Sequence, residues 1–471
     1  MSNREPSNRT VDYLGPIAGS ASLASTAFNL SDVGYVEEEY FLEGLASRFD
    51  PEGDLGADGR WQVRPGAQAP FKTRIVVYRP GDLARFTGVV AVEWLNVSAG
   101  FDMCPDWIYM HREMIRAGAA WIGVSAQKVG IEGTGAAAFG PPRHLKVADP
   151  ARYAGLDHPG DAYAFDTFAS AGRLAREGRL FGGVRPPIVV ATGHSQSAAY
   201  LVTYINAVDR LDPVFDGFLV HGRPGAAAPL DGAGALARTG RRADIRIRDD
   251  GRSPVLTVQA ETDVIGGLMS VGSRQPDSDC FRLWEIAGAA HGDNYVALAG
   301  AMDSGLAAPT DLAALMKPTR TLFGLSFDEA ANCAPQHHYV LNAAFFHLVR
   351  WIQHGAAPPQ APVLDVASID PPAFRLDPWG NALGGVRTPW IDAPTAISSG
   401  LAQSASPLSA LLGFTRPFSA ETLEALYPQG RGDYRRLFDE ALEQAVAAGF
   451  VLEADRAECR ALSDALYPEA P

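Results

Sequence analysis

The feature of this sequence that most restricts its fold is a serine set between an apolar strand and a helix of small residues. Residues 187–200 read PIVVATGHSQSAAY, so that Ser195 follows an apolar, β-branched run and then Gly193 and His194. A strand that turns sharply into a helix needs small neighbours, and it holds the serine hydroxyl above the helix N-terminus, where backbone N–H groups favour negative charge. Ser197 replaces the second glycine of the common G-x-S-x-G pattern and is still small. The pattern indicates a nucleophile elbow, although a serine-capped helix after a buried strand would look alike.

The chain around this turn alternates apolar strands with helical patterns. Strands are expected near 88–94, 119–125, 187–192, 217–221, 255–259 and 283–286, with helices near 107–117, 163–177, 197–208 and 339–354. Continuous apolar runs are typical of parallel strands that helices cover on both faces. An antiparallel pair, 34–45 and 71–78, opens the chain. We therefore predict an α/β fold with a mostly parallel central sheet flanked by helices.

Long loops and a separate C-terminal part complete the predicted organisation. Three stretches rich in Gly, Ala and Pro, 130–154, 223–253 and 293–335, are too long for simple connections, and loops of that length often cover a site. We expect them to be cap-like insertions that roof the serine within a core at 1–355. A Pro-rich segment then leads into helices near 420–427, 433–448 and 455–467. Residues 356–471 are thus predicted to be an extension packed on the core.

Charge and composition narrow the function classes. The 471 residues are 47% hydrophobic, as in ordinary folded domains, and 40 basic against 54 acidic residues give a net charge of −14. Such a charge repels phosphate backbones and anionic lipids, so neither nucleic acid nor a membrane is an expected partner. The chain begins without the apolar stretch of a signal peptide, which predicts a cytoplasmic protein, or a periplasmic or secreted one if a signal has been removed.

A histidine and an acid follow Ser195 in the order that a serine nucleophile needs. His291 follows a predicted strand in the turn GAAHGD, where it can take the serine proton, and a carboxylate must then fix its tautomer. Glu261 and Asp263 both come just after the end of the preceding predicted strand, and either could be that acid. We favour Asp263 because it lies further into the loop, with Glu261 as the alternative and Asp293 as a weaker third choice.

An oxyanion formed at Ser195 would need two backbone donors. One is the N–H of Gln196, the residue after the nucleophile. The other should come from the loop in the segment VEWLNVS (92–98), which follows an apolar strand, with Trp94 or Leu95 as the expected donor. Glu93 ends this otherwise apolar strand. A carboxylate there is poorly solvated, so we expect it to have a partner.

The sequence does not favour a metal or a cofactor. The four cysteines are scattered without CxxC spacing, which leaves room for one or two disulfides but not for a zinc ribbon. The pair His337 and His338 lacks further ligands at metal spacing and is expected to be a surface or helix-start pair. The glycines of 133–140 do not open a helix after a strand and lack the lysine of a phosphate loop.

Several segments resemble a bacterial α/β-hydrolase-domain family of poorly characterised serine esterases, over nearly the whole chain. The similar segments are YVEEEYFLEG (35–44), FKTR (71–74), VEWLNVS (92–98), HPGD (158–161) with Tyr163, the serine turn itself, QAETDV (259–264), GAAH (288–291), GN (380–381) and GGVRTP (384–389). The resemblance implies an α/β-hydrolase fold with Ser195 as nucleophile, His291 as base and an acid from the 261–263 loop. It implies no particular substrate.

The sequence therefore predicts a serine hydrolase that cleaves a small-molecule carboxylic ester through an acyl-enzyme intermediate, without a cofactor. An acyltransferase or a thioesterase would use the same three residues. A catalytically silent binding or scaffold protein is the alternative from another class. The oligomeric state stays open.

Overall fold

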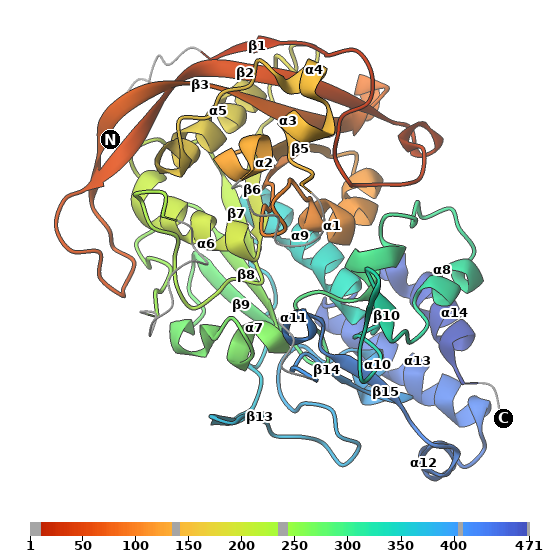
Figure 1. Cartoon of the computed structure of the whole chain (residues 1–471). Coiled ribbons are helices and arrows are strands. Elements are labelled where there is room, and N and C mark those ends of the chain that lie inside the picture. Colours follow the sequence, from red (N-terminus) through yellow and green to blue (C-terminus); the bar gives the residue numbers. More distant parts are fainter. Residues whose placement is uncertain (1–10, 134–141, 234–243, 404–407, 469–471) are drawn as a thin grey trace.

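Nine strands form one large sheet at the centre of the computed structural model, which describes residues 11–133, 142–233, 244–403 and 408–468 (Figure 1). The strand order is β1-β2-β3-β5-β4-β6-β7-β8-β9. The strands are β1 (Asp12–Leu14), β2 (Tyr35–Pro51), β3 (Val63–Pro80), β4 (Val89–Trp94), β5 (Ala120–Val124), β6 (Ile188–His194), β7 (Gly217–His221), β8 (Val255–Ala260) and β9 (Phe281–Ile286). Within this sheet the pairs β1–β2, β2–β3 and β3–β5 are antiparallel, and the remaining pairs are parallel. The predicted α/β fold with a mostly parallel sheet is confirmed.

Helices cover both faces because the central strands are apolar on both sides. Every residue of β4 is buried, and its side chains alternate: Val90 and Val92 pack with α5 (Ala164–Arg176) and α6 (Gln196–Thr203), whereas Val89 and Ala91 pack with the helices of the opposite face. Those helices are α1 (Pro105–Arg116) and α9 (Gln336–His354). Each face of the sheet therefore has its own hydrophobic core.

The position of α1 depends on Glu93, which the sequence predicts to be poorly solvated and therefore to have a partner. Its carboxyl group accepts hydrogen bonds from the backbone N–H of Asp106 (3.0 Å) and Trp107 (2.8 Å) and from the indole of Trp121 (2.8 Å). Pro105 starts the helix, where its missing N–H costs nothing. A strand side chain thus satisfies the free N–H groups of the first helical turn, and the expectation that Glu93 has partners is confirmed.

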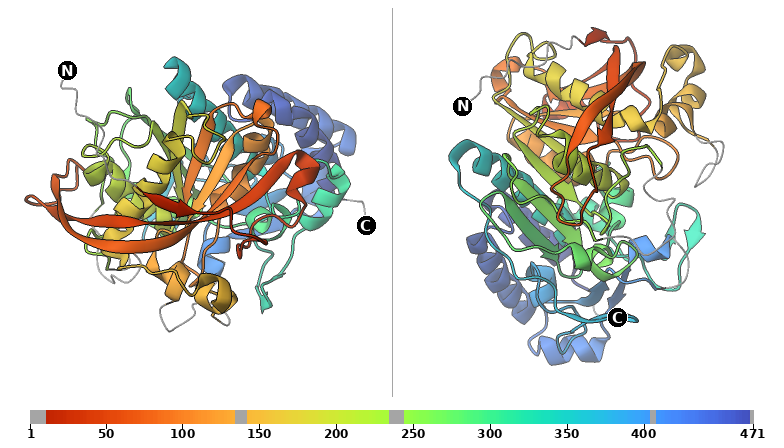
Figure 2. Two further views of the ribbon diagram at one scale, coloured as in Figure 1. Left: turned by 90° about the horizontal axis from the view of Figure 1, so that it is seen from above. Right: turned by 90° about the vertical axis from the view of Figure 1, so that its left-hand side faces the viewer.

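The β2–β3 hairpin is longer than the sequence suggests, and its outer part extends past the helices (Figure 2). The C-terminal helices α13 (Arg431–Ala448) and α14 (Arg456–Leu466) lie side by side near α9 (Figures 1 and 2). Phe438 and Leu442 of α13 share a hydrophobic core with Val340 of α9. The C-terminal segment is therefore joined to the sheet through one of its two cores.

Shorter elements connect these parts. The remaining α-helices are α2 (Lys128–Glu132), α3 (Leu145–Ala148), α4 (Pro150–Tyr153), α7 (Glu261–Ile265), α8 (Pro309–Leu315), α10 (Pro389–Asp392), α11 (Ser409–Leu412) and α12 (Ala420–Leu426). Three small antiparallel pairs are β10 (Thr321–Leu322) with β11 (Leu325–Ser326), β12 (Val366–Ile369) with β13 (Pro372–Phe374), and β14 (Ala396–Ser399) with β15 (Phe414–Pro417). Single helical turns lie at Leu30–Val33, Leu83–Arg85, Asp161–Tyr163, Tyr204–Val208, Ser270–Ser273, Tyr295–Ala299 and Glu453–Asp455.

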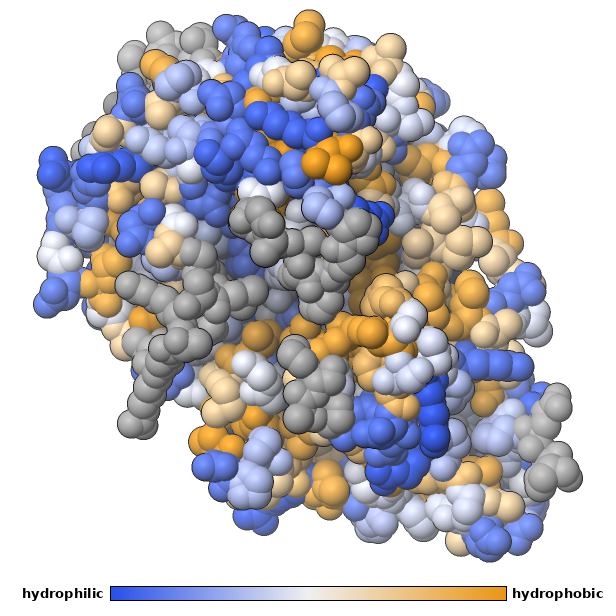
Figure 3. All heavy atoms as spheres, in the orientation of Figure 1, coloured by the Kyte–Doolittle hydropathy of each residue, from blue (hydrophilic) through white to orange (hydrophobic). Residues whose placement is uncertain are grey.

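Two of the three long insertions are described only in part, since 134–141 and 234–243 lie outside the described residues together with most of the 133–140 glycine segment. The described part of 223–253 contacts α6 through Ala228 N–H and the β2–β3 hairpin through Arg246 N–H. The insertion at 293–335 exposes several large apolar side chains, and hydrophobic residues gather on this face near α8 and β10 (Figure 3): Leu298, Met302, Leu306, Leu315, Phe323 and Leu325. That the insertions roof the serine stays a prediction.

No helix among the described residues is long and apolar enough to cross a bilayer. All four cysteines are free, so the disulfides that their number allowed are not formed.

Candidate active site

Ser195 occupies a strained turn between β6 and α6. Its backbone has φ 64° and ψ −121°, in the region that residues other than glycine rarely adopt. The turn is held by the Ser195 N–H, which donates to the carbonyl of His221 at 2.9 Å. Gly193 is tightly packed, because a Cβ atom there would lie 3.1 Å from Leu201 Cδ1 and 3.2 Å from the Ser197 side chain, so a larger residue would displace its neighbours by a few tenths of an ångström. Small residues around the serine suit this turn, and a strained serine at such a turn suggests a chemical role.

The structure brings Ser195, His291 and Asp263 together. His291 Nε2 lies 2.8 Å from Ser195 Oγ, and His291 Nδ1 lies 2.7 Å from Asp263 Oδ1. Asp263 lies in α7, directly after β8, and its other oxygen accepts the N–H of Ala260 at 2.6 Å. The predicted contact between the serine hydroxyl and His291 is present. The arrangement can move a proton from the hydroxyl to an imidazole whose tautomer a carboxylate fixes.

Glu261, the alternative acid, does not contact His291. Its carboxyl oxygens accept the N–H groups of Gly288 (2.6 Å) and Gly400 (2.8 Å), and the hydroxyl of Ser399 lies at 3.1 Å. Burial raises the pKa of Glu261 to about 7, against the bonds from Gly400 and Gly288, which favour the ionised form. Glu261 thus ties β14 and the turn before His291 to the start of α7.

The pKa of Glu261 predicts how stability responds to pH. Between about pH 4.5 and 7 the unfolded chain ionises this group while the folded chain keeps its proton, so its contribution to stability is full below pH 4.5 and is lost as pH rises towards 7. We expect the wild type to lose about 1.4 kcal/mol per pH unit relative to Glu261→Gln over this window, up to about 3 kcal/mol. Urea unfolding of both proteins at pH 5 and pH 8 measures this difference. Equal pH dependence of the two proteins would contradict the raised pKa.

Asp293, the third candidate acid, points elsewhere. Its Oδ1 accepts the N–H of Val296 at 3.0 Å, and its Oδ2 lies 3.3 Å from Nδ1 of His337. His337 and His338 begin α9, as expected for a helix-start pair, but both are buried, so the expectation of a surface pair is wrong. Their burial follows from α9 packing directly against the sheet.

One of the two donors predicted for the oxyanion is already used. The N–H of Leu95 donates to the carbonyl of Val124 of β5 at 3.2 Å, whereas Trp94, the last residue of β4, stays a prediction. The Val97 N–H of this loop has only a long contact, of 3.5 Å, with Gln196 Oε1. The sequence could not show this, because the hydrogen bonds depend on β5 and on the Asn96–Met103 bridge.

Polar side chains fasten this loop to the serine turn. Asn96 Nδ2 donates to the carbonyl of His194 at 3.0 Å. The amide of Gln127 accepts from Gln196 Nε2 (2.6 Å) and from the indole of Trp94 (3.1 Å), and donates to Asp161 Oδ2 at 2.9 Å. Gln196 begins α6 with its own backbone N–H at the helix N-terminus, where intrahelical partners are missing. The two backbone donors therefore lie on segments held to each other by buried side chains.

The C-terminal segment supports the site in a way that the sequence did not reveal. Thr262 Oγ donates to the carbonyl of Gly400 at 2.5 Å and accepts the N–H of His291 at 3.0 Å. A Cβ atom on Gly400 would lie 2.4 Å from the carbonyl oxygen of Ala289, so only glycine allows this approach. The acid loop and the histidine turn are thus both tied to residues more than a hundred positions later.

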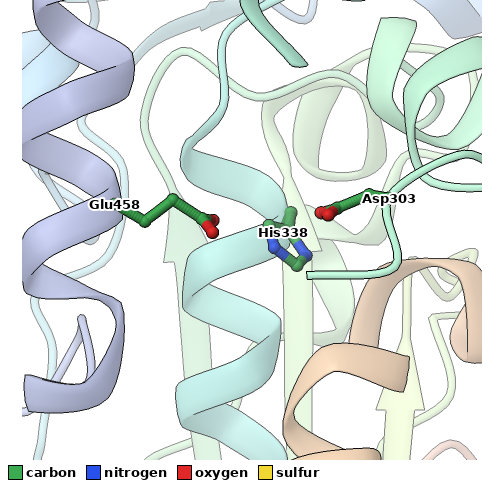
Figure 4. A group of neighbouring side chains, drawn as sticks. All are labelled: Asp303, His338 and Glu458. Carbon is green, nitrogen blue, oxygen red and sulfur yellow. The ribbon is translucent and has the colours of Figure 1, made fainter. Parts of the chain in front are cut away.

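A group that resembles a metal site lies on the α9 face of the sheet. Asp303, His338 from α9 and Glu458 from α14 place their ligand atoms within 4.8 Å of one another (Figure 4). Both carboxylates are already bound by Arg112, whose guanidinium lies 2.7 Å from each. A fixed guanidinium supplies the positive charge that a cation would bring, so the arrangement fits a buried ion-pair network rather than a metal centre.

Comparisons with known proteins agree with this fold. Residues 11–461 match the alpha/beta hydrolase domain family. Similar solved structures include a fungal esterase from Rhizomucor miehei (11% identity, 69% of this chain, 92% of that one, TM-score 0.33). Another is an α/β serine hydrolase without a lid from Xanthomonas campestris (11% identity, 51% and 83%, TM-score 0.28). A third is a thermostable esterase from Pseudomonas putida (13% identity, 50% and 66%, TM-score 0.26). No curated protein matches the sequence.

Proposed function

The chain belongs to the alpha/beta hydrolase domain family, and we propose that it hydrolyses carboxylic esters of small molecules through an acyl-enzyme intermediate. The observation that carries the proposal is the continuous hydrogen-bonded line from Ser195 Oγ through His291 to Asp263. The three residues come from the turn after β6, from α7 and from the turn after β9, and they meet in the order that proton transfer from a serine requires. The combination supports nucleophilic catalysis by serine.

In the proposed reaction, Ser195 Oγ attacks the ester carbonyl while His291 Nε2 takes the hydroxyl proton. The ring then gives that proton to the leaving alcohol, and water repeats the sequence to release the acid. Asp263 keeps the Nδ1–H of His291 in place and stabilises the imidazolium. The negative oxygen of the tetrahedral intermediate would be held by the N–H groups of Gln196 and Val97, each worth about 10²- to 10³-fold in kcat. The chemistry needs no cofactor.

Hydrolysis and acyl transfer use the same residues, so the fate of the acyl group separates them. We expect p-nitrophenyl esters of short fatty acids to be converted fully in water, with one equivalent of carboxylic acid formed for each p-nitrophenol released. An acyltransferase would stop after about one equivalent per serine until an alcohol or amine acceptor is added. Quantifying both products by chromatography and absorbance distinguishes the two, and thioesters of the same acyl chains test the thioesterase alternative.

A silent scaffold would fail in a different way. It would release no p-nitrophenol from any ester and would not react with a fluorophosphonate at Ser195. Reaction of the probe at this residue, identified by mass spectrometry, would support the proposed nucleophile even when the natural ester is absent from the tested set.

A further inference from the structure

Histidine side chains that the proposed reaction does not use are buried behind His291. His194, the residue before the nucleophile, stacks on the ring of His291 with centroids 4.4 Å apart and planes at 25°. The centroid of His221, the last residue of β7, lies 4.3 Å from that of His194, with the ring planes at 49°. Gly222 packs closely against His194 and His291, since a Cβ atom there would lie 3.0 Å from His194 and 3.2 Å from His291 Cε1. The ring of His194 thus contacts both the proposed base and the end of a central strand.

His221 is in turn held at both ring nitrogens. Its Nδ1 lies 2.8 Å from Asp106 Oδ1 of α1, and its Nε2 lies 2.9 Å from Nε2 of His337 of α9. The other oxygen of Asp106 accepts the hydroxyl of Thr192. The position of His194 therefore depends on helices from the far face of the sheet, which makes the stack rigid rather than adjustable.

The ring of His194 is neutral in this environment. Its Nε2 is buried and has no hydrogen-bond partner among the described residues. A protonated ring would leave a charged N–H buried without an acceptor, which is costly. Burial lowers the pKa of His194 well below its ordinary value, and the neighbouring His291 and His337 lower it further. The face that meets His291 is accordingly an uncharged aromatic surface.

We propose that His194 is a positioning residue that stabilises the imidazolium form of His291 and fixes its ring plane during ester hydrolysis. The inference rests on the proposed function. When His291 takes the proton of Ser195 it becomes a cation whose face lies against a neutral aromatic ring, and such contacts are favourable, the more so away from water. His291 is 5% exposed, so its charge is poorly solvated and the contact matters.

Other charged and titratable groups around the stack come from several elements. Asp263 of α7 contacts His291 directly, whereas Asp293, two residues after His291, lies beyond the stack against His337. From α1, the ring of Tyr109 lies 6.3 Å from His194 and 5.3 Å from His221, and burial holds its pKa well above the ordinary value, so it is uncharged. Of these groups Asp263 alone touches His291, and it is unchanged in the variants that test the proposal.

The test compares His194→Asn, which removes the ring, with His194→Phe, which keeps an aromatic face. Loss of the ring makes the imidazolium less stable, so His291 gains its proton only at lower pH. We expect the acidic midpoint of kcat/KM to move down by about half a pH unit in His194→Asn and kcat to fall about threefold to thirtyfold with KM unchanged. The Phe variant should keep the wild-type midpoint and most of kcat. If it folds poorly, the pH dependence of Ser195 labelling by a fluorophosphonate in His194→Asn supplies the same midpoint.

His338→Asn is the matched control. His338 is also a buried, stacked imidazole, with its ring 4.1 Å from that of Tyr295 and its Nδ1 2.7 Å from the carbonyl of Tyr109, but it has no contact with His291. Its loss should lower stability while the midpoint of kcat/KM stays in place. An unmoved midpoint in His194→Asn, or the same shift in His194→Phe or His338→Asn, would overturn the proposal. Wild-type protein without esterase activity or labelling would instead refute the proposed function.

Discussion

Replacing Ser195 with alanine should reduce the hydrolysis of p-nitrophenyl esters by about 10⁴- to 10⁶-fold in kcat. In the proposed mechanism this hydroxyl forms the acyl-enzyme, and without it His291 and Asp263 have no serine proton to move. The residual rate would come from the backbone donors and from binding alone. The change can be followed by p-nitrophenol absorbance with enzyme at high concentration, so that a residual rate is measurable.

The fold of the variant is a necessary control. Because alanine at position 195 must adopt φ near 64°, some stability is gained or lost at the turn independently of chemistry. Urea midpoints of the two proteins separate this effect from catalysis. Retention of more than about a tenth of kcat in a folded Ser195→Ala protein would show that another nucleophile acts, and the proposed mechanism would fall.

The central sheet could be predicted because each of its central strands can be recognised from its own apolar run. Apolar runs that end in Trp94 and His194 are buried on both faces, and that burial is what their composition encodes. The hairpin of β2 and β3 was underestimated for an equally local reason. Pro65 and Pro70 argue against a strand, yet both lie in β3 paired with Phe49 and Leu45, where much of the hairpin is solvent-exposed and a missing N–H is tolerated.

The site could be predicted only to the extent that the order of its residues along the chain determines it. Ser195 and His291 each follow a predicted strand, and parallel strands bring the loops after them to one edge of the sheet. What the sequence could not give are contacts that depend on distant partners. Leu95, one of the two predicted backbone donors, is unsuitable because its N–H donates to Val124 of a neighbouring strand. The support from Gly400 was missed because no local pattern signals a close backbone approach across the chain.

The stacked histidines are a second example of contacts that the sequence could not predict. His194 is part of the most informative motif in the sequence, but a histidine before a nucleophile carries no visible role until the fold sets it against His291 and His221. The sequence predicts His337 to belong to a surface or helix-start pair, and only the helix-start alternative agrees with the structure. In the structure His337 is buried, with its Nε2 2.9 Å from Nε2 of His221, which in turn contacts Asp106. A cluster of side chains that come from the sheet and from its helices cannot be recognised from any one segment of the sequence.

Asp263→Asn should lower kcat by about 10⁴-fold while Glu261→Gln changes kcat by less than about threefold. The two carboxyl groups are separated by one residue, and only Asp263 reaches His291. An asparagine nitrogen facing Nδ1 would act as a donor and so favour the tautomer whose Nε2 carries hydrogen, which cannot accept the serine proton. The loss should therefore appear in kcat and in the rate of fluorophosphonate labelling, with KM nearly unchanged.

Glu261→Gln is the matched variant because it removes a neighbouring buried carboxyl group without touching the ring of His291. Its effect should be confined to stability, since Glu261 holds the backbone of Gly288 and Gly400. A large loss of kcat in a stable Glu261→Gln protein, together with a nearly active Asp263→Asn protein, would reverse the assignment of the acid. Because the two variants lose a carboxyl group from the same helical turn, a difference between them in kcat points to the contact of Asp263 with His291 rather than to the loss of a buried carboxyl group as such.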